Sequence, residues 1–169
     1  MISAIQIDDG RLQQQLDKLR RQLGDAVERG LRRATELLRA AVSALAASPT
    51  GVPAASPLGE LAASVRSEVV DERGNASGHI FLAPPADQYG LFVEVGSRPH
   101  FPPPAALEGW VRRRLGITGE REAREIAFLI GRKISRLGTP GRLIFERALE
   151  QNKDRVIGIF EEEIAKALN

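Results

Sequence analysis

Cysteine is absent from this chain of 169 residues. Its absence excludes disulfide bonds, thiolate nucleophiles and metal sites with cysteine ligands. Histidine occurs only twice, at His79 and His100, which disfavours a metal site built on imidazole ligands. Aromatic residues make up only 5% of the chain, so its core must consist mainly of leucine, valine, isoleucine and alanine. We therefore expect no metal site and no cofactor.

Long apolar runs and strong net charge are also missing. No run approaches the roughly 20 residues that a membrane-spanning helix needs, and the first ten residues, MISAIQIDDG, lack the pattern of a secretory signal. We expect no membrane partner. The net charge of +2 is too small to indicate a dedicated nucleic-acid binder. The hydrophobic fraction of 43% and the charged fraction of 27% are typical of a soluble globular protein.

Residues 11–46 carry the clearest periodic pattern in the chain. Apolar residues recur there at steps of three and four, which predicts one long amphipathic helix. Such a helix is about 54 Å long, whereas a compact domain of this size is roughly 30 to 35 Å across. Part of its apolar stripe is therefore expected to extend beyond its own core and to need a partner. The stripe consists of Leu12, Leu16, Leu19, Leu23, Val27, Leu31, Ala34, Leu38, Ala41 and Leu45.

The remaining pattern predicts an α+β fold in a single domain over residues 1–169. Residues 47–57 are rich in Pro, Ala, Ser and Gly and predict a flexible linker. Residues 58–97 predict a small antiparallel sheet of about three strands, the third in YGLFVEVGS at 89–97. Residues 98–104 form a proline-rich arm. Residues 105–169 predict helices packed on the sheet, with stops at Gly116 and Gly138.

Few residues could support catalysis. No phosphate-binding glycine motif and no HExxH zinc motif occurs, and most acids alternate with bases, as solvated helix faces do. Glu94 could act as a general acid if it were buried. His100 lacks evident partners for a catalytic base and is better explained as an exposed loop histidine. We expect no enzymatic activity and assign no catalytic residue.

Two groups of three basic residues each, at positions 112–114 and 132–136, leave two interpretations open. Residues 100–147 contain ten bases and five acids, a local net charge of +5. This excess could face phosphate groups, in a DNA channel or on a partner, or it could be ordinary helix surface. The six are Arg112, Arg113, Arg114, Arg132, Lys133 and Arg136.

Four pieces in order resemble the tail-component family of tailed bacteriophages, whose members are described as head–tail joining, neck or tail-completion proteins. The long helix comes first, and a G-x-L-x-x-S-V segment follows at residues 59–65. A tyrosine, Tyr89, then precedes a V-E-x-G turn at residues 93–96. Last comes a Gly-Thr element at residues 138–139 with an aromatic residue, Phe145, and a helix that includes Ala148 and Leu149. Two positions depart from the usual pattern, since Leu58 and Val95 stand where a threonine and an aromatic residue are usual.

The resemblance implies a structural virion protein, assembled in the bacterial cytoplasm, that forms a homo-oligomeric and most often six-fold ring. The ring lies at the head–tail junction or the top of the tail. Its implied partners are the neighbouring neck or connector proteins, the tail-tube or terminator proteins, and non-specific DNA in the channel. A tail terminator is an alternative, and a DNA-binding accessory protein that uses the helices at 112–136 is another.

The proline-rich arm and the segment before it are the expected subunit interface. A short strand and a stiff arm can dock onto a neighbouring subunit by strand addition or groove insertion. We expect Glu94 to meet an arginine across the boundary, so that Glu94→Gln and Arg98→Ala block assembly and leave the monomer folded. The expected interface residues are Tyr89, Phe92, Glu94, Gly96, Arg98, His100, Phe101 and Pro103.

Overall fold

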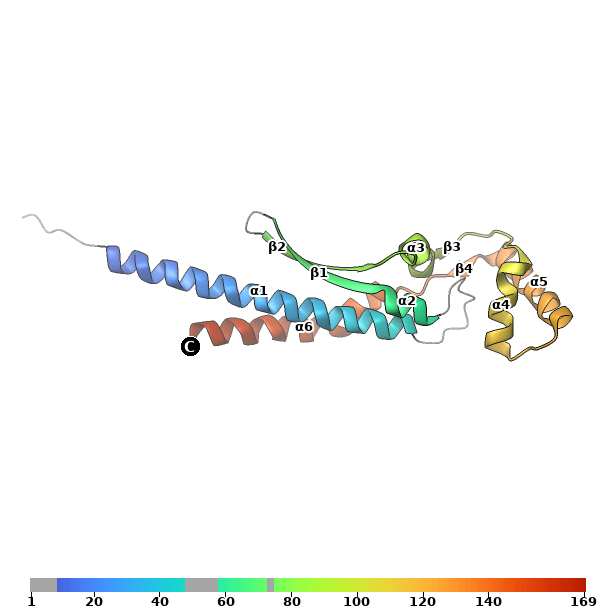
Figure 1. Ribbon diagram of the computed structural model, residues 1–169. Coiled ribbons are helices and arrows are strands. Elements are labelled where there is room, and N and C mark those ends of the chain that lie inside the picture. The colour runs from blue at the N-terminus through green and yellow to red at the C-terminus, as the bar shows by residue number, and fades with distance from the viewer. Residues whose placement is uncertain (1–8, 48–57, 73–74) are drawn as a thin grey trace, which may run out of the picture. The chain divides into compact units, whose positions relative to one another are not determined.

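A computed structural model describes residues 9–47, 58–72 and 75–169 (Figure 1). It confirms the predicted α+β class, with a long N-terminal helix, a small antiparallel sheet and C-terminal helices. Residues 48–57 of the predicted linker lie outside the described residues. The elements are α1 (Gly10–Ala47), α2 (Leu58–Ser64), β1 (Val65–Glu72), β2 (Asn75–Leu82), α3 (Asp87–Val95), β3 (Gly96–Ser97), α4 (Pro104–Leu115), α5 (Glu120–Leu137), β4 (Thr139–Pro140) and α6 (Ile144–Leu168).

The chain divides into two compact units, each built from segments that are distant in sequence. The described residues of the first unit are 9–37, 68–72, 75–79 and 153–169, and those of the second are 38–47, 58–67 and 80–152. The helices α1 and α6 and the hairpin of β1 and β2 contribute residues to both units. The single domain over residues 1–169 stays a prediction.

In the first unit, α1 packs closely against α6 and the hairpin because its contact residues are small. Ala26 is fully buried, and a Cβ at Gly30 would lie 2.8 Å from the ring of Phe160. A side chain at Gly78 of β2 would collide with the hydroxyl of Thr35. Gly30 costs a helix about 1 kcal/mol relative to alanine, and the close approach of the Phe160 ring explains its presence.

A cluster of charged side chains joins α1 to α6 in the same unit. The Glu163 carboxylate accepts hydrogen bonds from Arg29 Nε at 3.0 Å and from an Arg33 terminal nitrogen at 2.5 Å. Lys166 Nζ lies 3.3 Å from the same carboxylate, whose side chain is only 6% exposed. The hydrogen bonds from Arg29 and Arg33 lower the pKa of Glu163 from 4.5 to about 2. Because three bases surround it, Glu163 stays ionised at any ordinary pH.

The second unit contains two separate apolar cores, and each large aliphatic side chain buried there contributes about 1.5–3 kcal/mol. The helices α4 and α5 enclose one core and end where the sequence predicts, at Gly116 and Gly138, whose φ angles are 66° and 68°. Its buried residues are Leu107, Val111, Ala123, Ala127 and Ile134. The other core consists of Val42, Ala46, Leu61, Val65, Ala86, Ile144 and Ala148.

The third strand predicted at residues 89–97 is wrong, because this segment is mostly helix α3. Only Gly96 and Ser97 are extended, as β3. A short apolar run does not separate strand from helix by periodicity alone. The buried or half-buried residues Ala86, Tyr89, Gly90 and Val93 follow helical spacing, but two of them are too small to stand out as apolar. The short helix α2 was likewise not predicted.

We expect the Glu163 cluster to make stability depend on pH in the acid range. A carboxylate with a depressed pKa stabilises the fold above its unfolded pKa, and this contribution is lost as pH falls toward the folded pKa. For Glu163 that window runs from 4.5 down to about 2. The melting temperature should therefore fall between pH 5 and pH 3 by more in the wild type than in Glu163→Gln.

The matched control is Glu150→Gln, which removes an exposed carboxylate earlier in the same helix. It should keep the pH dependence of the wild type. Equal pH profiles for Glu163→Gln and the wild type, measured by circular dichroism melts, would show that the cluster does not stabilise the fold.

Candidate functional site

Two backbone segments of the second unit, residues 93–98 and 138–143, run antiparallel in direct contact, and this contact is called the crossing below. Glycine allows this contact at three positions. A Cβ at Gly96 would lie 2.7 Å from the amide nitrogen of Gly141, and a Cβ at Gly141 would collide with the carbonyl oxygen of Glu94. At Gly138 the obstacle is the carbonyl oxygen of Ser97. Gly96 and Gly138 also have φ angles of 84° and 68°, which disfavour any residue with a side chain.

The crossing is held by a short antiparallel pair of strands, β3 and β4. Gly96 lies opposite Pro140, and Ser97 lies opposite Thr139. The amide of Ser97 donates to Thr139 Oγ1 at 3.1 Å, and the two hydroxyl oxygens lie 2.8 Å apart. Side-chain hydroxyls thus add hydrogen bonds to a ladder that is only two residues long.

Next to the crossing, Glu94 caps the N-terminus of α6. Its carboxylate accepts hydrogen bonds from the amides of Ile144 at 2.8 Å, Phe145 at 3.1 Å and Glu146 at 3.4 Å. These amides belong to the first turn of a helix and have no partner inside it. A carboxylate also complements the positive end of the helix dipole. The carboxylate expected to meet an arginine of another subunit therefore binds a helix of its own chain.

Arg142 has the opposite role at the C-terminus of α1. Its guanidinium donates to the carbonyl oxygen of Leu45 at 2.7 Å and to that of Ala46 at 3.4 Å, in the last turn of the helix. The residue is only 7% exposed. Burial, and then the charge of Arg147, lower the pKa of Arg142, but an arginine stays charged near neutral pH. A buried cation therefore stabilises the negative end of α1.

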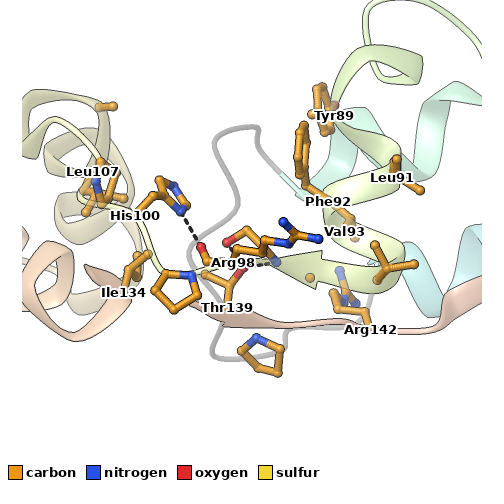
Figure 2. A pocket seen from close by; sticks show the side chains of 17 residues that line it. Tyr89, Leu91, Phe92, Val93, Arg98, His100, Leu107, Ile134, Thr139 and Arg142 are labelled. Atoms are coloured by element: carbon orange, nitrogen blue, oxygen red, sulfur yellow. Dashed lines mark hydrogen bonds between the residues drawn. The ribbon is translucent and has the colours of Figure 1, made fainter. Parts of the chain in front are cut away.

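Beside the crossing lies a groove of about 920 Å³ (Figure 2). Leu91, Phe92 and Tyr89 are on one side of it, and Leu107 and Ile134 are on the other. The walls are mostly apolar, as in sites that bind other molecules. On the α3 side, Leu91 is 65% exposed and Phe92 is 59% exposed. The groove therefore presents large apolar side chains that the described residues leave uncovered.

Some of the expected interface residues line this groove and others do not. The groove is lined by Tyr89, Phe92, Gly96, Arg98 and His100. Of the others, Glu94 caps α6, Pro103 precedes α4, and Phe101 packs edge-on against Phe128 with ring centroids 5.8 Å apart. The proline-rich arm thus packs partly on α5 of its own chain. The role of these residues at a subunit interface stays a prediction.

The side chain of His100 is exposed, as the sequence indicates. Its Nδ1 lies 2.8 Å from the carbonyl oxygen of Arg98, two residues before it. The Tyr89 hydroxyl is buried and has no hydrogen-bond partner among the described residues. Neither the His100 ring nor the Tyr89 hydroxyl is therefore part of a pair of nucleophile and base of the kind that acyl or phosphoryl transfer requires.

The structure places the six basic residues in two groups at opposite ends of the α4–α5 hairpin. Arg124 pairs with Glu108 at 3.3 Å, and Gly131 lies against Phe101. In this register the loop between the helices lies at the end near Arg114, far from the C-terminal turns of α5. One group holds Arg112, Arg113 and Arg114, and the other holds Arg132, Lys133 and Arg136; all six are exposed. Their role toward DNA or a partner protein stays a prediction.

Among the residues that the structure describes, no group of three acids or histidines could hold a metal ion. Within the same ranges, no helix is long and apolar enough to cross a bilayer. Comparison with family models, curated proteins and solved structures finds no match for the chain.

We expect the Glu94 cap to contribute measurably to folding stability. Replacing a capping residue with alanine costs about 0.5–2 kcal/mol, and the lost charge at the helix end adds to that cost. Glu94→Ala should therefore lower the free energy of unfolding by about 2 kcal/mol in a urea titration, and Glu94→Gln by about half as much, because its amide oxygen can still accept.

The control for this prediction is Glu150→Ala, which removes an exposed carboxylate later in α6. It should change the free energy of unfolding by less than about 0.5 kcal/mol. If Glu94→Ala is no more destabilising than this control, the cap is not a determinant of the fold.

Proposed function

We propose that this protein is a non-enzymatic structural subunit of a tailed bacteriophage or prophage. Its copies close into a ring, six-fold by the resemblance, at the head–tail junction or the top of the tail. The ring joins the connector to the tail tube and surrounds the DNA channel. The protein is then a component of the virion, assembled in the bacterial cytoplasm.

The structure supports this proposal by bringing together pieces of the resemblance that are far apart in the sequence. Gly96 belongs to the V-E-x-G turn, and Thr139 belongs to the Gly-Thr element. In the strand pair of β3 and β4, Gly96 lies opposite Pro140, the residue that follows Thr139. Glu94 of the same turn caps the helix that carries Phe145. Short motifs that meet in this way form one structural element, and are harder to attribute to chance than isolated matches.

The observation that carries the proposal is an apolar seam on α1 that the described part of the chain covers only in part. The seam is buried at Ala26 and Gly30, where α6 packs against it. The same seam is 58% exposed at Leu12, 41% at Leu16 and 37% at Leu19. A soluble protein rarely leaves a continuous apolar surface uncovered unless a partner binds there.

The spacing of the seam indicates what kind of partner covers it. Leu12, Leu16, Leu19, Leu23 and Ala26 alternate steps of four and three, which is the a/d spacing of helices packed side by side. A helix already covers the seam where α6 is present, so a second helix fits its continuation. Each copy of the chain carries the same uncovered helix face, so a helix of a neighbouring copy can cover it, and repetition of this contact closes a ring when the rotation permits.

We expect the purified protein to self-associate, and the seam to be required. Changing Leu12, Leu16 and Leu19 together to glutamine removes the apolar contact but keeps good helix formers at each position. Light scattering after gel filtration should show an oligomer for the wild type and a monomer for the triple variant at equal concentration.

The matched control is Lys18→Gln with Arg21→Gln, on the opposite face of the same turns of α1. It should keep the mass of the wild-type oligomer. A wild-type protein that remains monomeric at high concentration, or a triple variant that assembles as the wild type does, would contradict the proposal.

A further inference from the structure

We infer that the apolar groove beside α3 binds the acidic, partly apolar face of α6 from a second copy of the chain. The inference rests on the proposed self-assembly and adds a second contact to it, distinct from the α1 seam. The two surfaces differ in kind, so the contact runs from the groove of one copy to the helix of the next.

The groove has the charge of a surface for an acidic partner. Arg98 and His100 lie at its exposed side, and the buried Arg142 contributes a third base. None of the described residues that line it is an aspartate or a glutamate. Its walls present Leu91 and Phe92 to solvent. A matching partner therefore combines apolar side chains with carboxylates.

The chain itself carries such a surface on α6. Asp154, Ile157, Glu161 and Leu168 follow one another at steps of three, four and seven, which places them on one face of the helix. All four are exposed, Ile157 by 49% and Leu168 by 61%. Carboxylates and aliphatic side chains thus alternate along one helix face. The charge of this face is opposite to that of the groove.

The ion pairs already present in α6 do not use this face. Glu162, Glu163 and Lys166 make the contacts with α1 and with one another. At 100° per residue they lie on another side of the helix from Asp154 and Glu161. The acidic face is therefore available while α6 remains packed in its own unit.

A contact between two different surfaces repeats from copy to copy. Each chain presents one groove and one acidic face, so the contact is head-to-tail and closes into a ring when the rotation permits. Opposite charges at the rim of such a contact set its orientation and speed its formation.

Charge reversal at each side tests the contact separately. Arg98→Glu alters the groove, and Asp154→Lys with Glu161→Lys alters the helix face. Because all three positions are exposed, each variant should fold as the wild type does, as circular dichroism melts can verify. In sedimentation velocity, each variant should associate at least about tenfold more weakly than the wild type, because each loses a charge pair at the docking surface. Arg114→Glu, at an exposed position outside the groove, is the matched control and should associate normally.

Mixing the two variants gives the decisive readout. The helix-face variant keeps an intact groove, and the groove variant keeps an intact helix face, so these two surfaces still match in the mixture. The two reversed surfaces also have opposite charges, so a second contact between the variants forms in part. We expect the mixture to associate more strongly than either variant alone. Combining all three substitutions in one chain should restore association in part, since the reversed charges again match.

The outcomes separate this inference from the proposed function. A wild-type protein that stays monomeric refutes the proposed assembly itself. A wild-type protein that assembles while Arg98→Glu assembles equally well refutes only the groove contact. If both variants assemble poorly but their mixture gains nothing, the groove binds another part of the chain or another partner, and the assignment of α6 is overturned.

Discussion

The structure depends on a carboxylate placed at a helix end. Glu94 accepts hydrogen bonds from the free amides in the first turn of α6. No local residue could do so, because the helix is preceded by Gly141, Arg142 and Leu143, whose side chains have no oxygen to cap it. The chain therefore brings a cap from about 50 residues earlier in the sequence. That requires the two backbones to cross almost in contact, and Gly96 and Gly141 permit the crossing.

The consequences of this crossing extend to the ends of two helices and to the groove that we assign to assembly. Arg142, inside the crossing, caps α1 from the opposite side, so that a single junction anchors the end of α1 and the start of α6. The chain that leaves the crossing forms the proline-rich arm and one side of the groove. Rigid support at the junction lets α3 hold Leu91 and Phe92 exposed without loss of the fold, which is the condition for a surface reserved for a partner.

The sequence predicts the long elements well and the junction poorly. The apolar stripe of α1 and the glycine stops of α4 and α5 are local signals, and they predict helices that the structure contains. The helix α3 was missed because small residues such as Gly90 form much of its inner face. Residue size is also a poor guide to the inner face of α5, because the small Ala123 and Ala127 are buried while the larger Leu129 and Leu137 remain exposed. The role of Glu94 depends on a contact across about 50 positions, and the one local sign was the absence of a capping residue before α6.

The central claim is that this chain leaves apolar helix surface uncovered for its own copies to cover. Electron microscopy of the purified wild-type protein at high concentration tests it most directly. The account predicts closed particles made of repeated copies, in which a helix of a neighbouring copy lies along the first turns of α1. Single, separate copies at every concentration, with those turns bare, would contradict it.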